Sequence, residues 1–136
     1  MRIDTYLSFN GNCEEAFAHY VRCFGGQHGP ISRYAGSPMA GDAPANWGDK
    51  IMHGSVTVAG HILMGADPPP DRYEAPRGFT LNVQIATTDE AERVFTALSA
   101  GGTVIMPIQK TFWAARFGVC VDRFGIPWQV NCEAAE

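Results

Sequence analysis

An internal repeat limits the fold of this chain more than any other feature of its sequence. Asn12 and Thr88 lie where two helices are predicted to begin, and two glycine pairs, starting at Gly25 and Gly101, lie where those helices are predicted to end. Both spacings are 76 residues. Glycine suits a helix C-terminus because it takes the left-handed conformation without strain. We therefore expect two copies of one structural unit within 136 residues.

Helical periodicity supports both helices. In the first, Asn12 is a candidate N-cap and Glu15 resembles the second half of a capping box. The second is predicted to begin near Thr87 or Thr88, with Glu90 three residues after Thr87. His19 precedes a core-facing tyrosine, so we expect it on the exposed side of its helix. The predicted apolar stripes are Phe17, Tyr20, Val21 and Phe24 in the first helix, and Ala91, Val94, Phe95 and Leu98 in the second.

Strand-like stretches flank the two helices in the same order. One precedes each helix, at 3–9 and 79–86, and three follow it. Those that follow are 27–34, 51–58 and 61–66 in the first half, and 103–109, 117–121 and 127–132 in the second. The chain thus reads as an α+β protein with a first βαβββ module at 1–67, a proline-rich linker at 68–78 and a second βαβββ module at 79–136. Residues 35–50 form a long loop, which suits either a mobile surface segment or a binding loop.

Composition excludes several kinds of partner. The chain is 46% hydrophobic with a net charge of −4, and its basic residues form no stripe that could neutralise phosphates. We therefore expect no nucleic acid and no membrane partner. Residues 1–9 lack the pattern of a signal peptide, which favours a cytoplasmic location. The four scattered cysteines are expected to be buried thiols.

Several local strings carry a family resemblance. They are YLSFNGNC at 6–13, TFWA at 111–114, and DRFGIPW at 122–128 followed by Asn131. With the paired modules, they resemble the PhnB-like branch of the vicinal-oxygen-chelate (glyoxalase/bleomycin-resistance) superfamily. The resemblance implies a cupped mixed sheet that encloses a pocket, in a chain paired as a homodimer. Some sequences of this type are labelled demethylubiquinone methyltransferases, but this sequence has no glycine-rich strand-to-helix turn for a nucleoside cofactor.

The resemblance also implies positions for a divalent metal. They fall near Thr5, near Thr80 or Asn82, at about Met64 and at Gln129. Such side chains form a poor site for zinc, nickel or iron. We therefore expect no cofactor and no metal. Binding of a divalent ion through His53, His61 or Asp67 is the alternative, although these residues do not follow the family pattern.

A set of aromatic, thioether and amide side chains is the candidate ligand site. The set consists of Trp47, Met64, Asn82, Phe112, Trp113, Gln129 and Asn131. Adjacent Phe112 and Trp113 would face opposite ways in a strand, so one could enter the cup while the other packs against a helix. Gln129 and Asn131 share a strand face, and amides in an apolar cup can orient a ligand. For these residues a structural role is the alternative.

His53 is the candidate catalytic residue. A histidine on the mixed face of its predicted strand could act as a general base near neutral pH. A structural histidine is the other reading. The sequence thus favours binding of a small, partly apolar molecule, with catalysis left open. The alternatives are a metal-dependent lyase, isomerase or dioxygenase, and a metal-free enzyme that uses His53.

Overall fold

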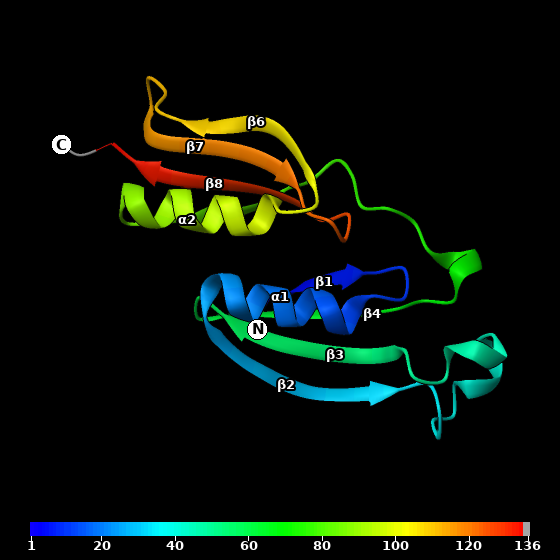
Figure 1. Cartoon of the computed structure of the whole chain (residues 1–136). Helices are drawn as coiled ribbons and strands as arrows, with labels where there is room; N and C mark the ends of the chain where they lie inside the picture. Colours follow the sequence, from blue (N-terminus) through cyan, green and yellow to red (C-terminus); the bar gives the residue numbers. More distant parts are fainter. Residues whose placement is uncertain (135–136) are drawn as a thin grey trace. The chain divides into compact units, whose positions relative to one another are not determined.

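The computed structural model describes residues 1–134, which form two compact units divided between Ala75 and Pro76 (Figure 1). Each unit contains one four-stranded mixed sheet and one α-helix, in the order βαβββ. The α+β class and the repeated module are therefore as predicted. Neither α-helix of the described chain is long and apolar enough to cross a membrane, since each has 12 residues.

The first unit contains one helix and four strands. They are β1 (Thr5–Ser8), α1 (Cys13–Phe24), β2 (Gly26–Arg33), β3 (Ile51–Val58) and β4 (His61–Ala66). The sheet order is β1-β4-β3-β2, with β1 parallel to β4 and the other pairs antiparallel. Three short 3-10 turns lie outside the sheet: Ala40–Asp42, Ala45–Trp47 and Pro70–Arg72. Ala59 and Gly60 both have positive φ, which closes the predicted β3–β4 hairpin.

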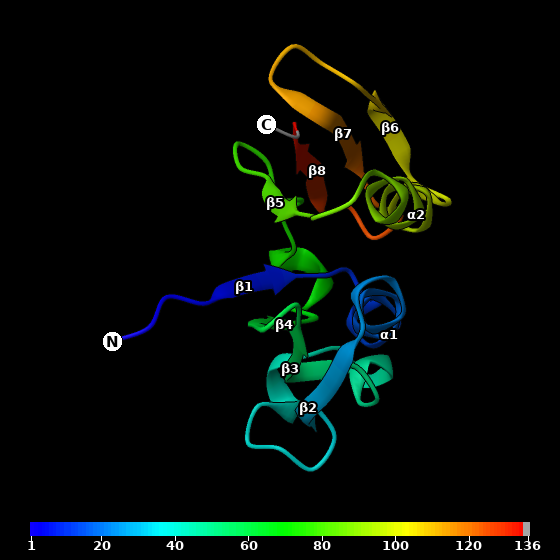
Figure 2. The ribbon, with the colours of Figure 1, turned by 90° about the vertical axis from the view of Figure 1, so that its left-hand side faces the viewer.

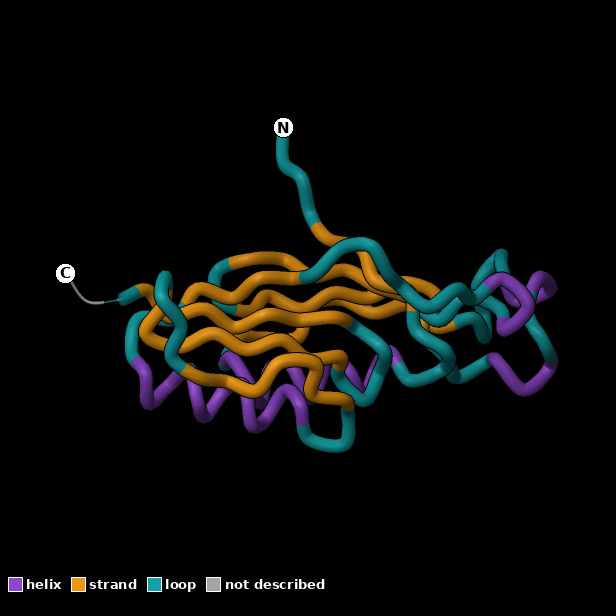
Figure 3. Tube along the Cα trace, turned by 90° about the horizontal axis from the view of Figure 1, so that it is seen from above, coloured by secondary structure: helices purple, strands orange, loops and turns teal. Residues whose placement is uncertain are grey.

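The second unit repeats this order of elements. It contains β5 (Leu81–Gln84), α2 (Thr88–Ser99), β6 (Thr103–Gln109), β7 (Ala114–Val121) and β8 (Pro127–Glu133). The sheet order is β5-β8-β7-β6, and its first pair is again parallel. In each unit the helix lies against one face of its own sheet (Figures 2 and 3). We call the opposite face of each sheet its open face.

Glycines let each helix pack closely on its sheet. In the first unit, Gly54 and Gly65 lie opposite each other in the β3–β4 ladder, and both lie beneath the ring of Phe17. Phe17 also packs edge to face against Phe9, with ring centroids 5.7 Å apart. In the second unit Gly118 makes room for Phe95. Burying a phenylalanine contributes roughly 1.5–3 kcal/mol, so these contacts help to fix each helix to its sheet.

The helix ends follow the repeat only in part. Thr87 caps α2 as predicted, since its Oγ1 accepts from the backbone N–H of Glu90 at 3.3 Å. Asn12 precedes α1 but its side chain forms no cap hydrogen bond, so the predicted capping box is wrong there. Gly25 and Gly101 both have a positive φ of 74°, which glycine adopts readily, but the ψ of 163° at Gly25 lies outside the left-handed helical conformation that the repeat predicted.

Two local expectations are wrong. His19 is buried within α1, where its Nε2 lies 3.6 Å from Sγ of Cys23. Phe112 and Trp113 lie in the β6–β7 connection rather than in a strand, and both are exposed. Ile51, at the start of β3, is buried, and the β2–β3 register shifts next to its partner Arg33.

Candidate functional site

The open face of the second unit brings together three of the predicted amides. Asn82 of β5 lies opposite Gln129 of β8, and the neighbouring row pairs Gln84 with Asn131. Val130 and Cys132, which alternate with these β8 residues, are buried on the α2 side. We call Asn82, Gln84, Gln129 and Asn131 the amide cluster. Sequence reasoning missed Gln84, although its two-residue spacing from Asn82 could have indicated it.

Three side chains of the amide cluster form a chain of hydrogen bonds in which each amide donates to the next residue. Nε2 of Gln129 donates to Oδ1 of Asn82 at 2.9 Å, and Nδ2 of Asn82 donates to Oε1 of Gln84 at 2.9 Å. Nε2 of Gln84 then donates to the carboxylate of Glu133 at 3.3 Å. The side chains are therefore held in a defined arrangement that ends on a negative charge.

Asn131 is the exception within the amide cluster. Its Oδ1 is buried and accepts no hydrogen bond, a condition that it shares with Oδ1 of Asn12 among the described residues. Buried amide oxygens are normally paired, and an unpaired one costs about 1–3 kcal/mol. The observed side-chain position is therefore not fixed by a hydrogen bond at this atom.

Aromatic side chains lie beside the amide cluster. Phe117 of β7 is directly opposite Asn131, and its ring is 5.3 Å from that of Trp113. Trp113 in turn meets Phe112 edge to face at 4.7 Å. The turn is set by Thr111, whose Oγ1 accepts from the backbone N–H of Ala114 at 3.0 Å. We call Phe112, Trp113 and Phe117 the aromatic group.

The open face of the first unit has different chemistry. Tyr6 lies opposite Met64, the same register position that Asn82 and Gln129 hold in the second unit. The Tyr6 hydroxyl is 3.1 Å from Nδ1 of His53, and their rings stack at 5.7 Å. Burial raises the pKa of Tyr6, so its hydroxyl stays protonated at neutral pH. Ser55 completes this row opposite Met64.

Trp47 lies apart from the residues of the open faces. It is buried, and its indole N–H donates to the backbone oxygen of Asp67 at 3.1 Å. The hydroxyl of Tyr34 donates to the same oxygen at 2.8 Å. Trp47 thereby ties the 35–50 segment to the end of β4.

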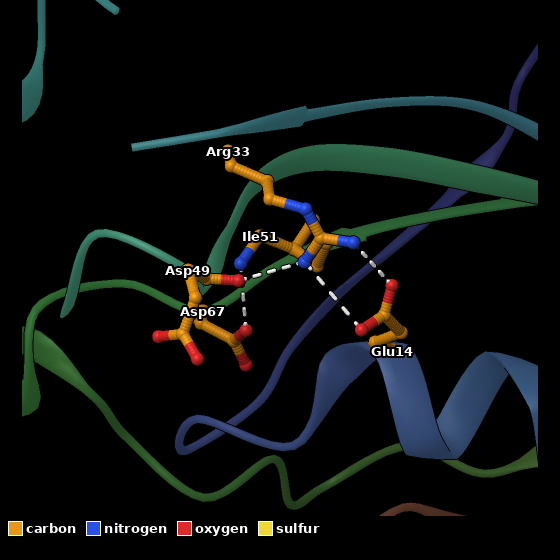
Figure 4. A network of polar contacts seen from close by, with 5 residues as sticks. All are labelled: Glu14, Arg33, Asp49, Ile51 and Asp67. Carbon is orange, nitrogen blue, oxygen red and sulfur yellow. Dashed lines mark hydrogen bonds and ion pairs between the residues drawn. The ribbon is translucent and has the colours of Figure 1, made fainter. Parts of the chain in front are cut away.

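Asp67 is a structural centre that sequence reasoning did not find. Its Oδ1 accepts from the backbone N–H groups of Gly11 and Cys13, and its Oδ2 from that of Ile51, each at 3.0 Å. Nearby, Arg33 bridges Glu14 of α1 and the backbone oxygen of Asp49 (Figure 4).

Burial in this region shifts two pKa values. Burial raises the pKa of Asp67, and the three backbone hydrogen bonds partly oppose the shift. Burial, together with the negative charge of Asp67, also raises the pKa of the Cys13 thiol, which keeps that thiol protonated.

Comparison with known proteins places this geometry in a family. Residues 1–131 match the family model described as 3-demethylubiquinone-9 3-methyltransferase. The chain is 35% identical to protein YjdN of Escherichia coli (strain K12) over 140 residues, covering 96% of this chain and 95% of that protein. The chain belongs to the 3-demethylubiquinone-9 3-methyltransferase family.

Solved structures confirm the PhnB-like resemblance. Protein PA1353 from Pseudomonas aeruginosa matches with a TM-score of 0.87 and 45% identity over 98% of both chains. The PhnB protein from Bacillus cereus matches with a TM-score of 0.83 and 26% identity over 97% of this chain and 99% of that one.

More distant structures show the fold alone. A glyoxylase/bleomycin resistance protein/dioxygenase domain from Frankia sp. EAN1pec matches with a TM-score of 0.65, 12% identity and 98% of both chains covered. The fosfomycin resistance protein FosX from Listeria monocytogenes matches with a TM-score of 0.67 and 10% identity, over 98% of this chain and 93% of that one. This PhnB-like member of the family therefore has the predicted glyoxalase/bleomycin-resistance fold.

The metal positions of the superfamily are a poor fit in this family member. Tyr6, not Thr5, is the β1 residue opposite Met64, and the other pair is Asn82 with Gln129. A phenol, a thioether and two amides are not the ligands that zinc, nickel or iron favour. Residues 1–134 contain no group of three or more His, Cys, Asp or Glu side chains arranged to hold an ion.

Proposed function

We propose that the chain binds a small, partly apolar molecule on the open face of its second unit and does not transform it. The observation that carries this proposal is the placement of an ordered amide cluster beside the aromatic group. Small-molecule sites combine apolar surface with a few fixed polar groups, and this face has both. Trp113 is 47% exposed, so its ring has free surface to offer a ligand.

A pair of matched variants tests this proposal. A library of small aromatic compounds, neutral and charged, is screened by heteronuclear NMR against the intact chain, with Trp113→Ala and Phe79→Ala as variants. The two side chains are 47% and 46% exposed, so both truncations remove similar exposed surface. We expect Trp113→Ala to lose binding and Phe79→Ala to keep it. Equal binding by both variants, or no binding by the unaltered chain, contradicts the proposal.

The pair Tyr6–His53 supports a second candidate, a metal-free acid–base activity. A histidine can accept a proton near neutral pH, and the adjacent hydroxyl could orient it. Once a turnover is found, His53→Gln is expected to abolish it, while Tyr6→Phe reduces it and changes its pH profile. Full activity of His53→Gln would exclude this role.

Two other activities have less support. The alternative metal-dependent lyase, isomerase or dioxygenase needs ligands that Met64, Asn82 and Gln129 do not supply. Methyl transfer, the activity in the family's description, usually requires a glycine-rich turn between a strand and a helix. The turns before α1 and α2, residues 9–12 and 85–87, hold one glycine, Gly11.

We also propose that the chain is a cytoplasmic homodimer. The edge strand β6 exposes Val104 and Ile105, at 46% and 61%, and exposed edge strands readily pair with a second chain. Light scattering is expected to find a dimer, which Ile105→Lys weakens. Ile3→Lys is the control, since Ile3 is 95% exposed outside the strands. A stable monomer would contradict the dimer.

A further inference from the structure

We propose that the open face of the second unit selects an uncharged, planar ligand that donates a hydrogen bond to Asn131, in preference to an anion of the same shape. The inference rests on the proposed binding function and adds the chemical class of the ligand. It is carried by the charges of the sheet, the direction of the amide hydrogen bonds and the unpaired oxygen of Asn131.

The strands of this sheet offer an anion no free cation. Strands β5 to β8 contain a single basic residue, Arg116. Its Nε lies 2.8 Å from the carboxylate of Glu92 in α2, so it is paired on the helix side of the sheet. The open face itself ends on the carboxylate of Glu133. An anion placed here would lose hydration without meeting an opposite charge, which is strongly unfavourable.

One hydrogen-bond acceptor of the amide cluster has no donor. The amide groups of Gln129, Asn82 and Gln84 each donate to the next acceptor in the chain. Oδ1 of Asn131, in the adjacent row, has no donor. Turning this side chain toward the open face breaks no hydrogen bond at Oδ1 and relieves the cost of an unpaired buried oxygen. A ligand N–H or O–H that donates to Oδ1 of Asn131 would therefore form a favourable hydrogen bond at this position.

The aromatic group supplies the remaining recognition. Phe117 is the residue opposite Asn131, and Trp113 packs at its edge. A planar ligand bound to Asn131 would lie against these rings, where aromatic contacts add about 0.5–1.5 kcal/mol beyond area burial. Ring stacking favours planar molecules of any charge, so the discrimination between neutral and anionic ligands falls to Asn131 and Glu133.

Benzamide and benzoate are the probes, because they share size and shape but differ in charge and in the N–H donor. Each is titrated into the isotope-labelled full chain while the Trp113 indole and Asn131 amide signals are followed. Fragments of this size bind at about millimolar concentration. We expect benzamide to bind about tenfold or more tightly than benzoate.

Two variants locate the effect. Asn131→Leu is expected to lose benzamide binding while its melting temperature stays the same or rises, because it removes an unpaired buried oxygen. Gln27→Leu, an exposed strand amide of the first unit, is the control that keeps binding. Lys110→Met removes the exposed lysine of the β6–β7 connection. If benzoate binds through this lysine, the variant loses benzoate binding and keeps benzamide binding.

The outcomes separate this inference from the function on which it rests. Equal binding of benzoate and benzamide, or benzamide binding that survives Asn131→Leu, overturns the selectivity and leaves the binding function standing. If neither probe and no compound of the library shifts the open-face signals, the binding function fails and the inference fails with it.

Discussion

The indole Nε1 of Trp128 donates a hydrogen bond to Oδ2 of Asp122 at 2.9 Å. The other carboxylate oxygen accepts from the backbone N–H groups of Phe124 and Ile126 at 2.9 and 3.0 Å. Gly125, with φ of 89°, provides the left-handed residue of the turn. The string DRFGIPW is therefore a folded turn held by one buried carboxylate. The residues of this string thus have a clear structural role.

Trp128→Phe is expected to destabilise the protein by about 1–3 kcal/mol, because it removes the donor to a buried charged oxygen. Urea unfolding followed by circular dichroism measures the change. Trp113→Phe is the control, since Trp113 is 47% exposed and donates no comparable bond to a buried carboxylate. If Trp128→Phe unfolds at the same urea concentration as the parent, the hydrogen bond contributes nothing measurable.

Asp67→Asn is expected to cost about 1–3 kcal/mol of unfolding free energy. Both carboxylate oxygens accept backbone N–H donors, and an amide would turn its NH2 group toward one of them. Asp71→Asn, on an exposed 3-10 turn, is the control and should be neutral. Chemical denaturation compares the variants, and equal losses would contradict a structural role for Asp67.

The stability contribution of Asp67 also depends on pH. Burial raises the pKa of Asp67 in the folded state above the ordinary value of 3.8. At a pH between 3.8 and the folded-state pKa, the folded chain therefore holds a proton that the unfolded chain has lost. Stability from this group is complete below 3.8 and falls as pH rises through the folded pKa. The cost of Asp67→Asn should therefore be larger near pH 4 than at pH 7. The opposite trend would mean that the pKa is lowered.

Local signals predicted most of the fold. Thr87 and the two glycines at Gly25 and Gly101 act on neighbouring backbone, so short-range chemistry reveals them. Asp67 could not be found in this way, because Gly11 and Ile51, which donate to it, are distant in sequence. The same limit applies to Asn12, whose side chain forms no cap hydrogen bond, while the backbone N–H of Cys13 donates to the distant Asp67.

The amide cluster was partly predictable for a similar reason. Asn131 and Gln129 share a face by the two-residue period of a strand, which requires no tertiary information. Their pairing with β5 could not be predicted from the strand pattern, because β5 and β8 are distant in sequence and become parallel neighbours only in the folded sheet. Trp113 lies outside the predicted strands, and its place in a turn depends on the Thr111 hydroxyl, which accepts from the backbone N–H groups of Trp113 and Ala114.

Gly118→Ala tests the packing of α2 on its sheet. A Cβ at this position would lie 2.7 Å from Cε2 of buried Phe95 and 3.1 Å from the backbone of Ile108. We expect a loss of about 1–3 kcal/mol, because overpacking forces the ring or the strand to move. Gly41→Ala is the control, since a Cβ there meets no atom within 4 Å. Equal melting temperatures for the two variants would show that the second core has more room than its distances indicate.

The two helix starts provide a matched comparison within one molecule. Thr87→Ala removes a side-chain bond to the N–H of Glu90 and should cost about 0.5–2 kcal/mol. Asn12→Ala should cost less or be neutral, because Oδ1 of Asn12 is buried without a partner and Asp67 already accepts from Cys13. Urea unfolding of both variants measures the difference. A larger loss for Asn12→Ala would mean that the capping box predicted from sequence forms in solution after all.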